Sequence, residues 1–345
     1  MTLTRFDRQV FLVKYRVSSY PVSAPSVPVL RTLAIIKELF ESGATEKFFD
    51  EKGDFLSKAD VEKRINEGAN TDSLGNLMFI QDIVETDKTF AVLINRATVD
   101  ATDPAFWNRK QNKVVPIKRG DGESPAFSGH LIIDKTGIGG TETSHRAVID
   151  RVPHLSRTIV QSYLRRLMKE YAEDNAEFTY KKKKGKKEET TEPFRPIIHV
   201  ANQATTSLEE DIKKGRITSV EFIRRTSAYA GLNQLPRVTG ASERLILRFE
   251  RGGVGRDQLT WLNSARETAL EAGYDEVLVK LDDLPNGGSS SPRFAVEKAE
   301  AADVLYSRCE LIENLPNELA QCTEKVDNDL ASSMIKFLTS AEFWR

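Results

Sequence analysis

Residues 130–152, HLIIDKTGIGGTETSHRAVIDRV, contain two apolar runs that are joined by a glycine-rich loop. The runs at His130–Asp134 and 145–152 carry the β-branched and aliphatic residues that favour strands. The loop GIGGTETS between them lacks the lysine and the Ser/Thr of a phosphate-binding P-loop, and a strand rather than a helix follows it. Its glycines therefore predict a tight turn, and the whole stretch predicts a β-hairpin.

The segments on either side extend this pattern. Before the hairpin, residues 76–99 are typical of two strands with a polar turn at Glu85–Lys88, and after it Ser156 caps a helix that ends near Asn175. Hairpins thus alternate with single helices, without the regular strand–helix repeat of a doubly wound fold. We expect an α+β protein with mixed, mostly antiparallel sheets and packed amphipathic helices.

The same criteria assign the remaining segments. Strands are expected at Gln9–Val17, 216–226, 242–251, 275–283 and 293–302. Helices are expected at Val29–Gly43, at 57–70 with Ser57 as cap, at 206–215 with Ser207 as cap, at 256–273 and at Lys325–Thr339. The mixed segment Asp103–Lys113 predicts a single helical turn.

Length and charge limit the possible functions. A chain of 345 residues has room for about two domains, which we expect to be an N-terminal α+β domain at 1–127 and a C-terminal α+β domain at 128–345. The 50 basic and 51 acidic residues give a net charge of −1, which excludes a globally basic nucleic-acid protein, so any cationic surface must be local. Neither a secretory signal nor an apolar run of the ~18–20 residues that span a membrane is recognisable, which predicts a cytoplasmic protein.

The most conspicuous local charge is a lysine run that only Gly185 interrupts. Strand-like residues precede and follow the run, so we expect a basic hairpin at 178–198 rather than an interdomain linker. Such runs are usually solvated loops, but further cations nearby would extend this one into a strip that matches a phosphate backbone. The predicted DNA-binding residues are Lys181, Lys182, Lys183, Lys184, Lys186, Lys187, Arg165, Arg166, Lys169, Arg195, Arg224 and Arg225, with Arg216 as a further candidate. Glu188, Glu189 and Glu192 would neutralise part of this charge.

Catalytic and metal-binding patterns are weak. The four histidines, His130, His145, His154 and His199, are scattered, and although His130 and His145 could face each other across the hairpin, the sequence offers no third ligand. Cys309 and Cys322 are expected to be reduced thiols. Asp282 and Asp283 end a predicted strand, where a nuclease could place metal-binding carboxylates, although a capped turn is the more common reason for such a pair. We therefore expect no cofactor and a non-enzymatic protein, with a metal-dependent nuclease as the alternative.

The segment VVPIKRGDGESPAFSGHLIID, Val114–Asp134, resembles the RexA family of phage-exclusion proteins and, more loosely, the KwaB component of the Kiwa anti-phage system. A strand ending in P-[IL]-x-R-G, a short polar loop and a second strand carry this resemblance. The flanking segments 89–107 and 145–167, and the closing strand and helix at 275–283 and 325–338, follow in the same order.

The resemblance implies a sequence-nonspecific double-stranded DNA-binding protein that acts as a sensor in phage exclusion or anti-phage defence. It also implies a homodimer and a membrane-protein effector encoded nearby, and it brings no catalytic residues. A third possibility is an interaction subunit of a membrane-associated defence complex, whose basic hairpin meets an acidic partner or anionic lipid.

Overall fold

The protein is an α+β protein with mostly antiparallel sheets that divides into two compact units. The computed structural model describes residues 5–50, 54–68, 75–99, 101, 105–120, 122–184, 188–203, 206–207, 212, 215–226, 241–249, 258–282, 291–295, 305–306 and 309–344. The larger unit comprises Thr4–Ala201 and Ile312–Ser340, and the smaller unit comprises Met1–Leu3, Asn202–Leu311 and Ala341–Arg345. The boundary expected between residues 127 and 128 falls inside a central strand instead, because the predicted hairpin is the middle of the larger sheet.

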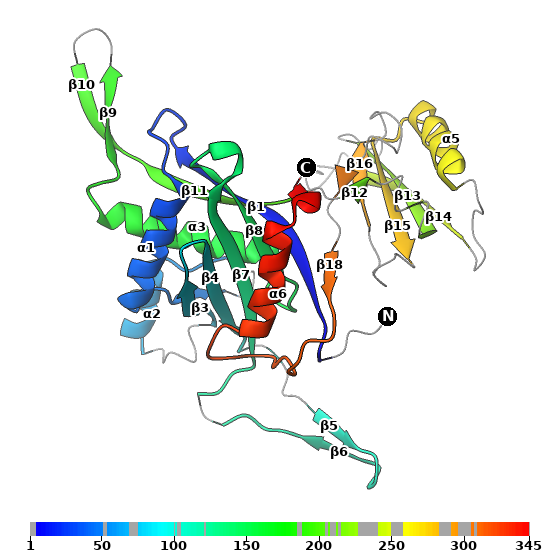
Figure 1. Cartoon of the computed structure of the whole chain (residues 1–345), viewed down its shortest axis with the longest axis horizontal. Coiled ribbons are helices and arrows are strands. Elements are labelled where there is room, and N and C mark those ends of the chain that lie inside the picture. Colours follow the sequence, from blue (N-terminus) through cyan, green and yellow to red (C-terminus); the bar gives the residue numbers. More distant parts are fainter. Residues whose placement is uncertain are drawn as a thin grey trace, which may run out of the picture. The chain divides into compact units, whose positions relative to one another are not determined.

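The sheet of the larger unit has the strand order β11-β1-β8-β7-β4-β3-β2 (Figure 1). The pairings β1–β8, β8–β7, β7–β4, β4–β3 and β3–β2 are all antiparallel. The strands are β1 (Arg8–Tyr20), β2 (Lys47–Phe49), β3 (Asn76–Glu85), β4 (Thr89–Ala97), β7 (Ala126–Gly137), β8 (Ser144–Asp150) and β11 (Arg195–Asn202).

The hairpin predicted from residues 130–152 is confirmed as β7 and β8. Leu131 faces Ile149, and Ile133 faces Ala147 across the ladder. The connecting turn is a short 3-10 helix, Ile138–Gly140, in which Gly139 has φ 61° and Gly140 has φ 77°. Both φ values lie in the left-handed region that glycine enters without steric cost, which explains the glycines of this loop.

Helices cover both faces of this sheet. On one face α1 (Val29–Glu41) and α3 (Arg157–Asp174) share a core with alternate residues of β4, among them Phe90, Val92 and Ile94. On the other face α6 (Asn328–Thr339) packs against β7 and β8 (Figure 1). The residues of β4 that point to either face of the sheet are therefore buried. For this reason the strand is apolar almost throughout, instead of alternating between apolar and polar residues.

On the sheet face that α6 covers, buried polar side chains form hydrogen bonds with the segment before this helix. The Ser128 hydroxyl donates to Asn95 Oδ1 at 2.6 Å, and the Asn95 amide donates to the Thr323 carbonyl at 3.2 Å. Further along, the backbone N–H of Asp327 donates to His130 Nε2 at 3.2 Å. We call residues 321–327 the strap, because several of its backbone groups find their partners on β3, β4 and β7.

Helix α2 (Lys58–Asn66) starts as the sequence predicts. The Ser57 hydroxyl accepts from the backbone N–H of Asp60, and the Asp60 carboxylate accepts from the backbone N–H of Ser57, which completes a capping box. The predicted cap Ser156 likewise accepts from the N–H of Ile159 at the start of α3, and Asn175 follows its last turn.

Two further hairpins extend from the larger unit (Figure 1). The first pairs β9 (Thr179–Lys184) with β10 (Glu188–Pro193) and confirms the hairpin predicted at 178–198. The second pairs β5 (Ala105–Asn108) with β6 (Lys113–Pro116). The helical turn expected at Asp103–Lys113 is therefore wrong in the described part of that segment, because β-branched and aromatic residues on both sides of a polar turn form a ladder.

The smaller unit has its own sheet, in the order β14-β13-β15-β16, and its own core. Its elements are β12 (Thr206–Ser207), β13 (Arg216–Thr226), β14 (Ala241–Arg248), α5 (Gln258–Glu271), β15 (Glu276–Asp282), β16 (Arg293–Ala295) and β17 (Leu305–Tyr306). Strand β18 (Cys309–Ile312) leads back to the larger unit. Near the end of the chain, Ala341–Trp344 form a 3-10 turn. Leu262 and Ala269 of α5 pack with Phe222 and Val279 of the sheet. The helix expected after Ser207 lies mostly outside the described residues.

Candidate functional site

The basic hairpin is a regular two-stranded ladder. Its register pairs Lys181 with Thr191, Lys182 with Thr190, Lys183 with Glu189 and Lys184 with Glu188. Lys181 and Lys182 are exposed. Lysine thus fills four consecutive positions of one strand, while Lys186 and Lys187 lie outside the residues that the structure describes.

One of these lysines has an ion-pair partner on the returning strand. Lys182 Nζ lies 2.9 Å from Glu192 Oε2, and this hydrogen bond raises the pKa of the Lys182 ammonium. Both groups are exposed, so solvent screens the pair and it can open to a competing anion. Thr190 and Thr191 face lysines on the other strand and add no negative charge.

The foot of the hairpin is anchored in the core by aromatic side chains. The Phe194 ring lies 5.4 Å from Phe178 and 5.9 Å from Tyr180, measured between centroids, and the Phe194 N–H donates to the Phe178 carbonyl at 2.8 Å. Phe178 in turn meets Tyr171 of α3 at 6.0 Å. These contacts give the lysine-bearing strand a rigid base.

Arg31 of α1 also stabilises the foot of the basic hairpin. Its guanidinium lies 2.6 Å from Glu38 on its own helix and 2.6 Å from Glu177, just before the hairpin, and it donates to the Tyr171 hydroxyl at 3.1 Å. Three elements are thus joined by a single cation: α1, α3 and the turn that leads into β9.

Arg165 and Arg166, two of the predicted DNA contacts, lie on α3, and several of their N–H groups donate hydrogen bonds to other residues of the protein. Arg165 donates through Nε to the Ile198 carbonyl at 2.6 Å and through Nη2 to His199 Nδ1 at 2.9 Å, and burial lowers the pKa of its guanidinium. Arg166 Nε lies 2.5 Å from Glu170 Oε1, and its Nη2 donates to the Leu56 carbonyl at 2.9 Å. Both arginines therefore hold α3 against its neighbours.

The other predicted cations are divided between the two units. Lys169 Nζ lies 3.7 Å from Glu173 Oε1 on the exposed side of α3, and the Arg195 guanidinium lies over the Tyr20 ring at 5.4 Å. Arg216, Arg224 and Arg225 belong to β13 of the smaller unit, where Arg224 pairs with Glu243 at 2.5 Å. Of the predicted contacts that do not pack inside the fold, the β9 lysines, Lys169 and Arg195 belong to the larger unit.

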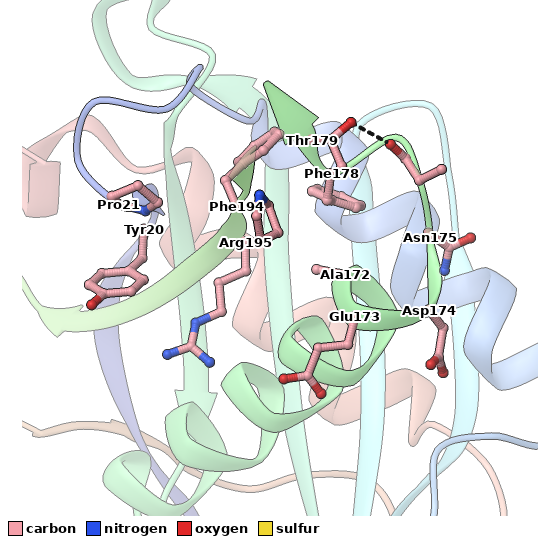
Figure 2. A pocket seen from close by; sticks show the side chains of 12 residues that line it. Tyr20, Pro21, Ala172, Glu173, Asp174, Asn175, Phe178, Thr179, Phe194 and Arg195 are labelled. Atoms are coloured by element: carbon pink, nitrogen blue, oxygen red, sulfur yellow. Dashed lines mark hydrogen bonds between the residues drawn. The ribbon is translucent and has the colours of Figure 1, made fainter. Parts of the chain in front are cut away.

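An open pocket of about 720 Å³ lies between the end of α3 and the foot of the basic hairpin (Figure 2). In Figure 2 the Arg195 side chain points between Tyr20 and Glu173, and Thr179 donates to the Ala176 carbonyl at 3.0 Å. The lining residues are Tyr20, Pro21, Ala172, Glu173, Asp174, Asn175, Ala176, Phe178, Thr179, Pro193, Phe194 and Arg195. Because aromatic walls meet one arginine and two carboxylates here, the pocket presents mixed charge rather than a purely cationic surface.

Of the residues that line this pocket, only Arg195 was predicted as a site residue from the sequence. Tyr20 lies far from the hairpin in the chain, and only the sheet pairing of its strand brings it close to Arg195. The aromatic residues that flank the lysine run at Phe178 and Phe194 are the signal that could have located the hairpin foot, because each lies immediately outside one strand of the ladder.

A metal site finds little support in the described parts of the chain, where three or more His, Cys, Asp or Glu side chains do not come together as a metal would require. His130 does not face His145: its Nδ1 lies 3.3 Å from Asp150 Oδ2, while Gly137 is the partner of His145. Asp282 ends β15 opposite Arg216, and Asp283 lies outside the described residues. Cys322 is an exposed free thiol.

Within the described helices, none is long and apolar enough to cross a lipid bilayer. Comparison of the chain with protein-family models, with curated proteins and with solved structures finds no match. The resemblance of Val114–Asp134 to the RexA family therefore stays a prediction, and the site is defined by its own geometry: a lysine-bearing ribbon with an aromatic foot beside a pocket of mixed charge.

Proposed function

We propose that this protein binds double-stranded DNA without sequence preference and that the hairpin β9–β10 contacts the phosphate backbone. The observation that supports the proposal is the row of lysines at four consecutive positions of β9, on a ribbon that extends from the larger unit (Figure 1). Neighbouring residues of a strand point to opposite faces, so the exposed Lys181 and Lys182 present cations on both sides of the ribbon. A two-stranded ribbon also fits the width of a DNA groove.

The chemistry of the lysines favours binding without sequence preference. A lysine ammonium is a flexible point charge that accepts any phosphate geometry, whereas base reading favours the fixed fork of arginine or a side-chain amide. The threonines and glutamates of β10 add no such fork to the ribbon. Affinity should therefore depend strongly on salt and little on base sequence.

The biological setting follows from the resemblance at Val114–Asp134. We propose that the protein works in the cytoplasm as a sensor in phage exclusion or anti-phage defence, as a homodimer, together with a membrane-protein effector encoded nearby. The protein itself is proposed to be non-enzymatic, since the proposed contact requires charge and not catalysis.

Salt-dependent binding tests the proposal. Replacing Lys181, Lys182, Lys183 and Lys184 with serine should flatten the slope of log affinity against log salt by about 3–4, at ~0.9 per phosphate contact, and should weaken two unrelated duplexes alike. The matched control replaces four exposed lysines elsewhere, Lys63, Lys88, Lys280 and Lys325, and should leave the slope within about one unit. An equal slope for wild type and the hairpin variant would rule out the hairpin as the DNA contact.

The nuclease alternative is tested separately. Plasmid DNA incubated with Mg²⁺ or Mn²⁺ should stay intact in the presence of the wild-type protein. Cleavage that disappears in Asp282→Ala would instead assign a metal-dependent reaction to the end of β15 and overturn the non-enzymatic proposal.

A further inference from the structure

The hairpin β5–β6 carries exposed apolar side chains on both of its faces. Phe106 is 58% exposed, Trp107 60%, Val114 59% and Val115 42%. The register pairs Phe106 with Val115 and Trp107 with Val114, so neighbouring pairs point to opposite sides of the ribbon. Exposed apolar residues that stand singly are ordinary, but an apolar cluster on both faces of one projecting ribbon marks an interaction surface.

The ends of this ribbon are cationic. Arg109 and Lys110 form the turn, Lys113 begins β6, and Lys118 follows its end, whereas residues 105–118 contain no Asp or Glu. In the described structure, none of these four cations has an ion-pair partner within the hairpin. The surface therefore combines an apolar middle with positive charge at both ends.

The turn holds the tip in a defined shape. Asn108 Oδ1 accepts from the backbone N–H groups of Lys110 at 3.0 Å and Gln111 at 3.2 Å, and Asn112 has φ 47°. Asparagine is one of the few side chains that both forms such a local turn and tolerates the left-handed region. Arg109 and Lys110 are thus placed at the tip by local hydrogen bonds, which are independent of any packing against the body of the protein.

We infer that the β5–β6 hairpin binds the surface of an anionic lipid membrane, lying along the headgroup region with its apolar middle in the acyl boundary. This inference is independent of the proposed DNA binding. Anionic headgroups over an apolar layer match both properties of the ribbon, and aromatic side chains such as Trp107 are favoured at that depth. A tip-first insertion would place Arg109 and Lys110 in hydrocarbon, which is costly, so the long axis of the ribbon runs parallel to the membrane plane. The ribbon enters by one edge, and both of its faces then contact the upper acyl region.

Two other occupants fit less well. Single-stranded nucleic acid stacks its bases on planar side chains, which Phe106 and Trp107 provide but Val114 and Val115 do not. A second copy of the same hairpin would bring two cationic ribbons together, and like charges repel. An acidic protein surface satisfies the charge but leaves the exposed apolar side chains of the ribbon without an apolar partner.

Vesicle binding by the full-length protein tests the inference. Wild type should sediment with vesicles of phosphatidylcholine mixed with phosphatidylglycerol and not with vesicles of phosphatidylcholine alone. Arg109→Glu with Lys110→Glu should lower the partition coefficient by at least roughly 25-fold, since each lost cation accounts for about fivefold. The double change Phe106→Ser with Trp107→Ser should abolish sedimentation. Both variants change exposed residues, and their thermal melts should match wild type.

A control variant on α2 and the fluorescence of Trp107 test whether the β5–β6 hairpin itself enters the membrane. Ile65→Ser, at a residue that is 50% exposed on α2, removes a comparable apolar side chain and should leave vesicle binding unchanged. With Trp261 and Trp344 replaced by phenylalanine, Trp107 is the remaining tryptophan, and its emission should shift to the blue and be quenched by brominated lipid.

The outcomes separate this inference from the DNA proposal. The serine variant of Lys181–Lys184 should bind these vesicles within about threefold of wild type, because the β5–β6 hairpin keeps its cations. Equal vesicle binding by wild type and the Phe106/Trp107 variant, or no binding by either, overturns the inference. If that variant instead loses affinity for DNA or for an acidic protein such as polyglutamate, the hairpin belongs to that partner and the lipid assignment is wrong.

Discussion

Arg166 Nε lies 2.5 Å from Glu170 Oε1, one turn further along α3, and Lys47 Nζ approaches the other oxygen of the same carboxylate at 3.1 Å. All three side chains are largely buried. This buried group joins α3 to β2, and it explains why a predicted phosphate contact, Arg166, serves the fold.

Glu170→Ala should lower the free energy of unfolding by about 3–5 kcal/mol, because it leaves two buried cations without their counter-charge. The measurement is urea unfolding followed by a probe in the larger unit. Glu173→Ala, one turn away on the exposed side, removes a partner of Lys169 and should cost at most about 1 kcal/mol. Similar losses for the two variants would contradict the buried triad.

His130→Ala should loosen the strap and α6. The His130 ring bridges Asp150 Oδ2 and the backbone N–H of Asp327, so its removal leaves a buried carboxylate short of a donor, at a cost of roughly 1–3 kcal/mol. Hydrogen exchange should show faster exchange of the Asp327 amide and of the first turn of α6. His154→Ala changes an exposed ring that contacts Phe127 and should leave α6 protected; loss of protection in both variants would point to general destabilisation.

Acid should destabilise the protein through His199. Burial, followed by the charges of Arg165 and Arg16, lowers the pKa of His199, and its ring accepts a hydrogen bond from Arg165. The unfolded chain therefore takes up a proton at higher pH than the folded chain does. The resulting stability is present above the unfolded pKa of about 6.5 and is lost as the pH falls toward the lowered folded value.

Thermal melts between neutral pH and pH ~5 measure this contribution. In His199→Gln the fall of the melting temperature over that range should be smaller than in wild type. His154→Gln, which replaces an exposed ring by the same residue, is the matched control for the substitution itself. An unchanged slope in His199→Gln would assign the acid sensitivity to other groups.

Tyr171→Phe should raise the pKa of Glu38. The Tyr171 hydroxyl donates to Glu38 Oε2 at 2.6 Å, and this bond, ahead of the hydrogen bond from Arg31, holds the Glu38 pKa below its ordinary range. An NMR titration of the Glu38 carboxyl should show its pKa moving up toward the usual value of about 4.3. In Tyr180→Phe, whose hydroxyl meets Ser23 instead, the Glu38 titration should not move.

Most elements of the fold follow from local patterns in the sequence. The apolar runs around Leu131 and Ile149 and the caps Ser57 and Ser156 are local signals, and each predicted the element that forms. The membership of the two units is not local. The boundary depends on which strand β7 pairs with, and that pairing is decided by packing along the whole chain.

The site shows the same limit. The lysine run identifies a basic hairpin by itself, but a sequence cannot show that Arg165 is used by the Ile198 carbonyl or that Arg224 faces Glu243. Both contacts join residues on different elements. Charge clustering in the sequence therefore overestimates the cationic surface, because the fold uses some of the cations as internal donors.

The insertion of the smaller unit between Ala201 and Ile312 also determines the order in which the protein is completed during translation. After β11 has emerged from the ribosome, residues 202–311 must be synthesised before the strap, which takes on the order of ten seconds. During that interval Asn95, Ser128 and His130 lack the strap groups that they bond in the finished protein. One face of the nascent larger unit therefore stays uncovered until the strap and α6, which follow the smaller unit in the chain, have been synthesised.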